Sequence, residues 1–401
     1  MVQMELREFL EICGFREFPF EIKPIRHPEI WAGREKILKE LKHFVTNVKV
    51  NGLCEFGIIT GEKGSGKTHS LFHIRYIIEQ DAKEEGIPAL VGYIDNPCGL
   101  GPKKLFPEVY RYITSAVLGS EELKKIFANS IDLINQLAVK KSSSLPPGEQ
   151  ARIRTPKEWS EWCESIYKEI INKPLIPYKL MKSLTEGESK ALDWITGMTK
   201  KSERIRGVTV QPLVSNILCA KALANIINLA VLRKTDGTPN LYSAAFLFVD
   251  QLEDIGTASP TVHRDQIVGW RTLIDEVQSY FGVLWAMTGS AEDISSYLTP
   301  AVDRRQTSNP EKLKLLPLEI DKVREFIIEI MKHFRKVDVK VPSIYPFSKD
   351  GLEEVITQTT ERLPSHLLTS CRIVTTKAAE EDRISSVKDK IDRDMVLEYL
   401  T

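Results

Sequence analysis

The chain has 401 residues, 42% of them hydrophobic and 27% charged, and this composition excludes a disordered or fibrous protein. Lys and Arg total 55, as do Asp and Glu, so the formal net charge is zero and charge alone gives no argument for nucleic-acid binding. The length predicts two or three domains with ample core.

The six cysteines are scattered and form no Cys-x-x-Cys pair, so neither a cysteine zinc site nor a disulfide framework is expected. We expect reduced thiols in a cytoplasmic protein. The N-terminal stretch has early acidic residues and no long apolar region, which is not typical of a signal peptide. No apolar run approaches about 18 residues, so we expect no membrane span.

Residues 1–50 form an N-terminal segment that begins with a short amphipathic stretch. Pro24 and Pro28 then favour extended backbone. A helical pattern starts just after Trp31 and Arg34 and precedes the next strand. Taken alone, these two residues are typical of packing and of a solvated charge.

An apolar run leads into a glycine-rich loop, and a helical pattern follows. The loop fits the P-loop pattern Gly61-x-x-x-x-Gly66-Lys67-Thr68, in which glycines allow close approach to a polyphosphate and N–H groups point at its oxygens. Lys67 is predicted to reach the β- and γ-phosphates of ATP, and Thr68 to ligate Mg²⁺. A chance glycine-rich turn is the alternative. The predicted cofactor-binding residues here are Gly61, Glu62, Lys63, Gly64, Ser65, Gly66, Lys67, Thr68 and His69.

A strand is predicted over 89–95 and a helix over 105–118, and this alternation indicates a parallel sheet. From about 119 to 240 the pattern changes to helical segments, with a breaker-rich loop at 142–148 and no strand of clear alternation. An apolar helix is predicted over 211–233. We interpret 119–240 as a large helical insertion into the nucleotide-binding core.

The insertion carries a local excess of positive charge, because residues 140–206 contain 14 Lys and Arg against 9 Asp and Glu. Much of the excess lies at Lys140, Lys141, Arg152, Arg154, Lys200, Lys201, Arg204 and Arg206. A nucleic-acid surface and scattered solvated charge both explain it, and the sequence does not separate them.

Residues 244–250 form an apolar strand that ends in a carboxylate. In a P-loop fold such an aspartate holds Mg²⁺, so Asp250 is predicted to act with Thr68; a turn or capping role is the alternative. Gln251 stands where most ATP-hydrolysing relatives have a glutamate base, and an amide cannot accept that proton. Three explanations stay open: Glu253 substitutes as the base, the protein is a slow switch, or Gln251 replaces a natural glutamate to trap ATP.

A helix over 264–280 leads to a strand over 282–288. Thr288 at its end is predicted to sense the γ-phosphate or orient water, with a turn-capping role as the alternative. Arg304 and Arg305 lie in a loop ahead of a strand-like stretch, where they are predicted to reach the ATP of a neighbouring subunit. An exposed loop pair is the alternative.

The pattern over 319–401 predicts a small all-α lid domain. Its helices are expected at 321–334, 351–360, 364–379 and 392–400. The chain is thus predicted to be α/β, with a P-loop parallel-sheet core over 51–318 between the segment 1–50 and this lid.

The order of parts resembles an AAA+ ATPase of the origin-recognition/Cdc6-like group over about 27–118 and 241–380. The matching pieces are Ala32–Glu35 after a Pro-Phe motif, the P-loop, the strands ending in Asp250 and Thr288, the Arg304/Arg305 loop and the lid. The resemblance implies ATP and Mg²⁺ at a subunit interface, with Arg34 over the nucleotide base. A looser resemblance, carried by Gly187–Gly197 and the apolar helix, is to ATP-binding proteins of bacteriophage-exclusion defence systems.

The chain departs from the group at three places. Gln251 occupies the glutamate position, and Ser365 follows Pro364 where the lid of the group carries a sensor arginine. Either Arg362 or Arg372 serves instead, or the chain has no sensor arginine, and the sequence leaves these alternatives open. Origin-binding members also carry a C-terminal winged helix, and none is expected here.

The sequence therefore predicts an ATP-binding AAA+ ATPase that forms a homo-oligomer or hetero-assembly with ATP and acts on DNA or a DNA-bound protein, in defence, transposition or replication. The rival prediction is a nucleotide-gated scaffold that hardly hydrolyses ATP and binds a protein partner through the insertion. A small-molecule kinase is a remote third, which the lid and the long separation of Lys67 and Asp250 disfavour. Pathway, subunit count and main partner stay open.

Overall fold

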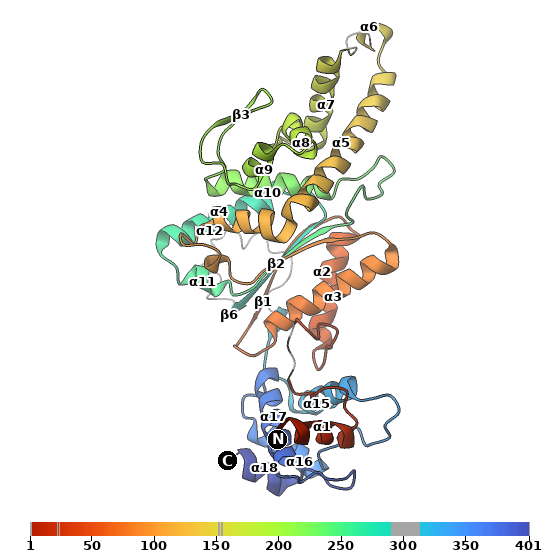
Figure 1. The fold of residues 1–401 in the computed structure, drawn as a ribbon, viewed down its shortest axis with the longest axis vertical. Coiled ribbons are helices and arrows are strands. Elements are labelled where there is room, and N and C mark those ends of the chain that lie inside the picture. The colour runs from red at the N-terminus through yellow and green to blue at the C-terminus, as the bar shows by residue number, and fades with distance from the viewer. Residues whose placement is uncertain are drawn as a thin grey trace. The chain divides into compact units, whose positions relative to one another are not determined.

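The computed structural model describes residues 2–21, 23, 25–150, 153, 155–289 and 313–400 (Figure 1). The chain divides into two compact units, each with its own hydrophobic core. The P-loop unit comprises Met1–Leu41, Thr60–Ile77 and Leu313–Thr401, and the sheet unit comprises Lys42–Ile59 and Ile78–Lys312. The domain boundaries expected after residues 50 and 318 stay a prediction.

Five strands form one sheet in the order β2-β5-β6-β1-β7. Their bounds are β1 Cys54–Gly61, β2 Leu90–Ile94, β5 Ala245–Val249, β6 Phe281–Thr288 and β7 Lys314–Leu315. In the sheet unit, β5 pairs in parallel with both β2 and β6 over its whole length. In the P-loop unit, β7 pairs in parallel with the end of β1 through Lys314 and Thr60. The predicted α/β fold with a parallel sheet is confirmed.

Alternate residues of a strand point to opposite faces of the sheet, and helices pack against the side chains on both faces. On one face, Phe44 of α2 (Glu35–Lys49) packs against Phe246, with ring centroids 6.3 Å apart. On the other face, Trp270 of α12 (Pro260–Glu276) packs edge-on against Trp285, with centroids 5.7 Å apart. The P-loop is followed by α3 Lys67–Glu85, and the chain after β2 and β5 forms the 3₁₀ turn Pro97–Gly99 and α11 Glu253–Gly256.

The predicted insertion is largely helical (Figure 1). It begins where α4 (Phe106–Tyr112) continues into a π-helical stretch, Ile113–Leu118. The helices after it are α5 Gly119–Ser143, α6 Pro147–Gln150, α7 Pro156–Ile170, α8 Tyr178–Thr185, α9 Ser189–Ile195 and α10 Asn216–Ala230. The amide of Asn225 ties α10 to α7 by donating to the Tyr167 hydroxyl at 2.9 Å, inside the core of the sheet unit.

Two expectations about the insertion were wrong. A hairpin, β3 Glu203–Ile205 with β4 Val208–Val210, stands where no strand was expected, because three-residue strands are too short to show alternation. Its turn residues, Arg206 and Gly207, both have positive φ, which is the geometry of a tight hairpin turn. Helix α10 is also shorter than predicted, because Ser215 caps its N-terminus through the amide of Leu218.

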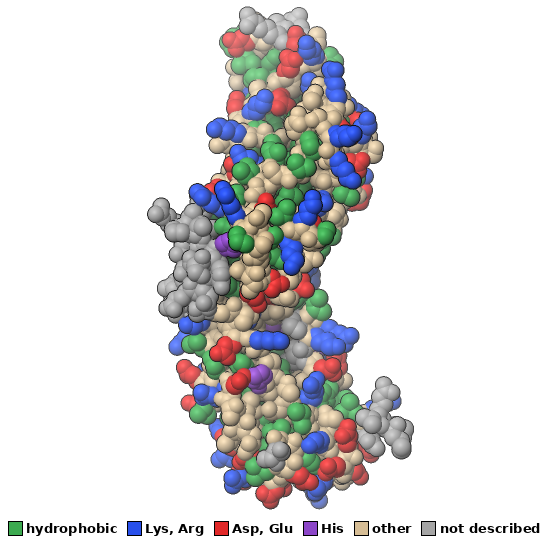
Figure 2. All heavy atoms as spheres, turned by 90° about the vertical axis from the view of Figure 1, so that its left-hand side faces the viewer, with side chains coloured by type: hydrophobic (Ala, Val, Ile, Leu, Met, Phe, Trp, Pro, Cys, Tyr) green, Lys and Arg blue, Asp and Glu red, His purple; other side chains and the backbone are tan. Residues whose placement is uncertain are grey.

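Positive charge in the insertion is partly paired with acids. Lys141 pairs with Glu169, and Arg206 pairs with Glu186 and Glu188. Figure 2 shows Lys and Arg side chains interspersed with Asp and Glu over the face that it draws. These pairs favour solvated charge at two of the predicted basic positions.

The P-loop unit contains an all-α bundle (Figure 1). Its helices are α1 Val2–Cys13, α15 Ile320–Phe334, α16 Lys349–Gln358, α17 Pro364–Glu380 and α18 Arg393–Leu400. The four predicted lid helices are therefore present. Helix α1 joins their core through Phe9 and Cys13, which the sequence did not indicate. Within the described residues, no helix is both long and apolar enough to cross a membrane.

Candidate nucleotide-binding site

The predicted P-loop connects a buried strand to a long helix, as its chemistry requires. Strand β1 ends at Gly61, and α3 begins at Lys67. Gly64 and Gly66 have φ of 85° and 99°, a region that residues with a Cβ rarely adopt. Apart from its own chain neighbours, no atom of the described residues lies within 4 Å of the place where a Cβ of Gly66 would be, so the described part of the chain leaves room beside this backbone.

Lys67 lies inside the loop, with only 9% of the residue exposed. Its ammonium donates hydrogen bonds of 2.9 Å to the carbonyls of Gly61 and Glu62. The hydroxyl of Ser65 is buried and has no hydrogen-bond partner among the described residues. A charged donor and an unsatisfied hydroxyl beside a glycine-rich backbone fit a polyphosphate.

The N-terminal segment lies along the first turns of α3. The imidazole Nε2 of His69 donates to the Ile30 carbonyl at 2.6 Å, and Nδ1 of His73 lies 2.7 Å from the Pro28 carbonyl. The Trp31 ring packs on the His73 ring, with centroids 4.8 Å apart. Burial lowers the pKa of His69, so its imidazole is neutral. His69, predicted to bind the cofactor, thus directs one ring nitrogen to this segment.

The guanidinium of Arg34 is only partly hydrogen-bonded within the described residues. One guanidinium nitrogen donates to the Leu316 carbonyl, just after β7, at 2.7 Å. Its Nε and Nη1 are buried and have no partner among the described residues. Burial lowers the pKa of Arg34 to about 10, so it is still charged at neutral pH. Two unsatisfied charged donors fit an anionic or acceptor-rich ligand, whereas the predicted contact with the base stays a prediction.

The lid helix α17 meets the P-loop within the same unit. The amide of Ser365, its second residue, donates to the Gly64 carbonyl at 3.2 Å. The lid is also joined to the end of the sheet, where the Leu318 amide donates to the Arg362 carbonyl at 3.0 Å. Arg372 lies exposed on α17. The sequence did not predict the Ser365 contact, because glycine patterns carry no information about distant partners.

In the sheet unit, Asp250 directly follows β5 and is only 3% exposed. The Tyr93 hydroxyl donates to its Oδ2 at 3.2 Å. Burial and the nearby Asp250 carboxylate raise the pKa of Tyr93, so this donor keeps its proton. A buried, hydrogen-bonded carboxylate at a strand end fits the predicted metal ligand, whereas Thr68 lies in the other unit and its predicted partnership with Asp250 stays a prediction.

Gln251 has left-handed backbone, with φ of 54°, and turns the chain immediately after Asp250. Its side-chain amide donates to Oδ1 of Asp95 at 2.9 Å. Glu253 accepts the backbone amide of Thr288 at 3.0 Å and so ties α11 to the end of β6. Glu253, considered as a substitute base, and Thr288, considered as a sensor, therefore contact each other.

The sequence analysis missed three polar residues at this end of the sheet, which are Tyr93, Asp95 and Asn96. The Asn96 amide donates to the Asp254 carboxylate at 2.5 Å. The available signal was their position in or just after β2, because parallel neighbours end at one edge of a sheet. Arg304 and Arg305 lie outside the described residues, and their predicted role is not tested.

Similarity to known proteins is found in structure and not in sequence. No protein-family model matches the sequence, and neither does any curated protein. The Orc1 protein of Aeropyrum pernix, solved in complex with DNA, aligns with a TM-score of 0.51 at 12% identity, over 96% of this chain and 69% of that chain. The chain therefore shares the fold of this Orc1 protein.

A second solved structure, the ORC2 protein of Aeropyrum pernix in ADPNP–ADP complexes, aligns over 96% of this chain and 72% of that chain. Its identity is 11% and its TM-score is 0.43, so it adds no argument. At such low identity the likeness to Orc1 shows a shared AAA+ fold, while function must be argued from the site. The looser likeness to bacteriophage-exclusion proteins stays a prediction.

Proposed function

We propose that this chain is an ATP-binding AAA+ ATPase that assembles when ATP is bound and acts on DNA or on a DNA-bound protein. Lys67 would hold the phosphates, and Thr68 and Asp250 would hold Mg²⁺. Arg304 or Arg305 of a neighbouring copy would stabilise charge on the transferred phosphoryl group. The work would belong to replication, transposition or antiviral defence.

The observation that carries the proposal is the P-loop itself. An eight-residue phosphate-binding pattern joins the buried end of β1 to the N-terminus of a 19-residue helix, with the Lys67 ammonium held inside the loop. The N-terminus of a helix favours anions because its backbone N–H groups have no partners within the helix. The Arg34 and Ser65 donors without partners lie in the same unit and support an anionic ligand.

DNA is proposed as the substrate class because the Orc1 protein that shares this fold was solved with DNA. The net charge of zero means that contacts with phosphates must come from a local surface. ATP would favour assembly only through a higher affinity for the assembled state, as required for any ligand that shifts an equilibrium.

The proposal is tested by light scattering and DNA-binding assays on the full chain, with and without Mg-ATP. We expect a larger species with ATP and DNA binding that weakens as salt rises, because counterions are released from the phosphates. Lys67→Ala should remove both effects of ATP, whereas Lys83→Ala, which replaces an exposed lysine in the last turn of α3 outside the predicted binding residues, should retain them. The same mass with and without ATP would contradict assembly.

A second candidate function is a nucleotide-gated scaffold, and Gln251 favours it. Its amide donates to Asp95, so the position expected for the base carries a hydrogen-bond donor rather than a proton acceptor. In this alternative, the chain binds ATP, hydrolyses it very slowly and recruits a protein through α5–α10.

Deletion of the α6 tip, Pro147–Gln150, helps to separate the two functions, because none of its residues is buried. A scaffold that binds through this end of the insertion loses its protein partner in a co-purification assay and keeps its ATP affinity. A DNA-acting ATPase keeps its DNA binding after the same deletion. DNA binding that is absent in the full chain at low salt favours the scaffold.

A further inference from the structure

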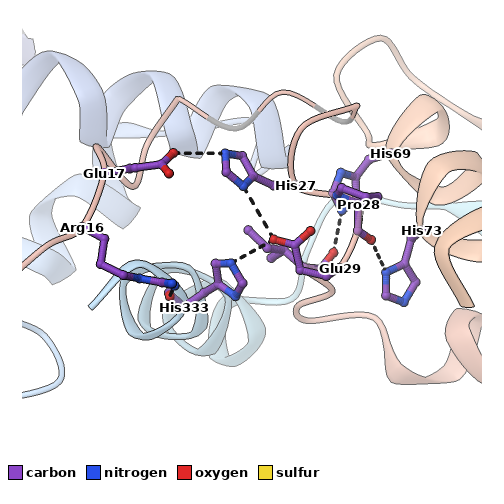
Figure 3. A network of polar contacts seen from close by, with 9 residues as sticks. Arg16, Glu17, His27, Pro28, Glu29, His69, His73 and His333 are labelled. Carbon is purple, nitrogen blue, oxygen red and sulfur yellow. Dashed lines mark hydrogen bonds and ion pairs between the residues drawn. The ribbon is translucent and has the colours of Figure 1, made fainter. Parts of the chain in front are cut away.

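Three side chains of the P-loop unit, those of His27, Glu29 and His333, point toward one another (Figure 3). His27 and Glu29 belong to the N-terminal segment, and His333 lies in the last turn of α15. One carboxylate oxygen of Glu29 lies 3.1 Å from Nε2 of His333 and 3.6 Å from Nδ1 of His27. One ligand atom from each of the three residues lies within 4.8 Å of the other two.

We propose that His27, Glu29 and His333 form a site for a divalent transition-metal ion of the zinc type. Two imidazoles and one carboxylate make up a common three-ligand zinc set, and imidazole selects such ions over Mg²⁺. Ligand atoms about 2.1 Å from a tetrahedral ion lie roughly 3.4 Å from one another. The two separations from Glu29, 3.1 and 3.6 Å, bracket this value.

The surroundings of His27 supply an independent argument. Its other ring nitrogen, Nε2, lies 3.7 Å from a carboxylate oxygen of Glu17 (Figure 3). This separation is an ion-pair distance, longer than a hydrogen bond. It places Glu17 on the side of the ring where a carboxylate usually orients a histidine ligand of zinc through the second N–H. Phe334 packs edge-on against both imidazoles, with centroids 4.9 Å from His27 and 5.0 Å from His333, and limits their rotation.

The site is partly open to solvent, because the side chains of His27, Glu29 and His333 are 15%, 31% and 30% exposed. An ion can therefore enter, and water can take the fourth position. The guanidinium of Arg16 donates to the His333 carbonyl rather than to the carboxylate, so it does not compete for Glu29.

The position of Glu29 couples this site to the P-loop helix. Its neighbours in the chain, Pro28 and Ile30, present their carbonyls to His73 and His69 of α3. An ion bound at Glu29 and His333 links α15 to the segment that lies along α3. The metal thus stabilises the P-loop unit in the arrangement that also contains Lys67.

The experiment uses the full chain after removal of metal by a chelator, titrated with Zn²⁺ by calorimetry and with Co²⁺ by absorption. We expect one ion per chain, a higher melting temperature with Zn²⁺, and cobalt d–d bands of a tetrahedral site without a thiolate charge-transfer band. The last result separates this site from the six cysteines. No zinc binding, or a thiolate band, overturns the proposal.

Three variants locate the ion. His333→Gln should abolish binding, and Glu17→Gln should weaken it about 10- to 100-fold, as expected for a residue that orients a ligand. Glu17 is 68% exposed, so this variant is expected to fold even if His333→Gln does not. His366→Gln is the matched control, because His366 pairs with Glu361 at 2.7 Å and, within the described residues, belongs to no group of three possible ligands. Binding that is equal in all three variants overturns the proposal.

Discussion

The carbonyl of Gly64 in the P-loop accepts a hydrogen bond of 3.2 Å from the amide of Ser365 in the lid helix α17. Glycine is favoured at position 64, because the φ of 85° disfavours a Cβ and an added Cβ would lie 2.0 Å from the Ser365 hydroxyl oxygen and 3.1 Å from the Ser365 Cβ. The loop and the lid are therefore matched at one backbone position, and changes at Gly64 affect both.

Gly64→Ala should lower the free energy of unfolding by about 1–3 kcal/mol, because it combines an unfavourable φ with a clash against Ser365. Gly66→Ala is the control, since its φ is also positive but no atom lies within 4 Å of the added Cβ. Urea unfolding should show the larger loss for Gly64→Ala. The double variant Gly64→Ala/Ser365→Gly should recover part of it, and equal losses for the two single variants would contradict the contact.

Arg34→Met should stabilise the nucleotide-free chain by about 1–3 kcal/mol, because it removes a buried charge with two unsatisfied nitrogens. The same change should weaken ATP binding if those nitrogens serve the ligand. Thermal melts with and without ATP measure both effects. Arg16→Met is the control, because Arg16 also donates to a backbone carbonyl but is exposed. A destabilised variant with unchanged ATP affinity would show that Arg34 is structural.

Most of the fold was predictable because its signals are local. The strand ending in Asp250 is uniformly apolar, and the helix that contains Phe326 and Ile327 has a clear amphipathic period, so each is recognisable in one short window. The hairpin at Arg206 and Gly207 was missed because its strands are only three residues long. The entry of α1 into the bundle core was missed because docking depends on distant residues.

The candidate site was predictable only as far as its motifs extend. The glycines and Lys67 are required by phosphate chemistry, so their pattern indicates their role. The partners of Gln251 and Glu253, which are Asp95 and the Thr288 amide, depend on how strands pair, and the sequence gives no register for parallel neighbours. The cluster at Glu29 was missed because its members are distant in sequence: His333 lies more than 300 residues further along the chain.

His69 should make stability depend on pH in the acidic range. Burial lowers the pKa of this residue in the folded chain from its ordinary value of 6.5, so the unfolded chain binds the proton more tightly. Stability is therefore complete above pH 6.5 and falls as the pH decreases below it, by at most about 1.4 kcal/mol per pH unit for one proton.

His69→Gln should reduce this pH dependence, because the amide can donate to the Ile30 carbonyl without titrating. Thermal melts between about pH 5 and pH 7 measure the slope in both proteins. His43→Gln, which replaces an exposed histidine, is the control and should keep the native slope. An unchanged slope in His69→Gln would show that other groups cause the acid sensitivity.

Gln251→Glu should raise the rate of ATP hydrolysis about 100-fold or more, because a carboxylate can act as the general base that the amide cannot. The new carboxylate would face Asp95, whose oxygen is 2.9 Å from the Gln251 amide nitrogen, and one of the two acids should then titrate at higher pH. The acidic limb of the rate profile should therefore move to lower pH in Gln251→Glu/Asp95→Asn. Gln251→Ala is the control, and a Gln251→Glu rate no higher than that of Gln251→Ala contradicts an ATPase role.

Calorimetric titration of the full chain with Mg-ATP measures whether the loop Gly61–Thr68 binds a nucleoside triphosphate. Wild type and Lys83→Ala should bind one ATP per chain, because Lys83 is exposed and lies in the last turn of α3, outside the predicted binding residues. Lys67→Ala should lose at least about 3 kcal/mol of binding free energy, roughly 100-fold or more in affinity, because the variant lacks the buried ammonium that is proposed to pair with the phosphates. Equal ATP affinity in Lys67→Ala and wild type, or no ATP binding by wild type, would contradict the account.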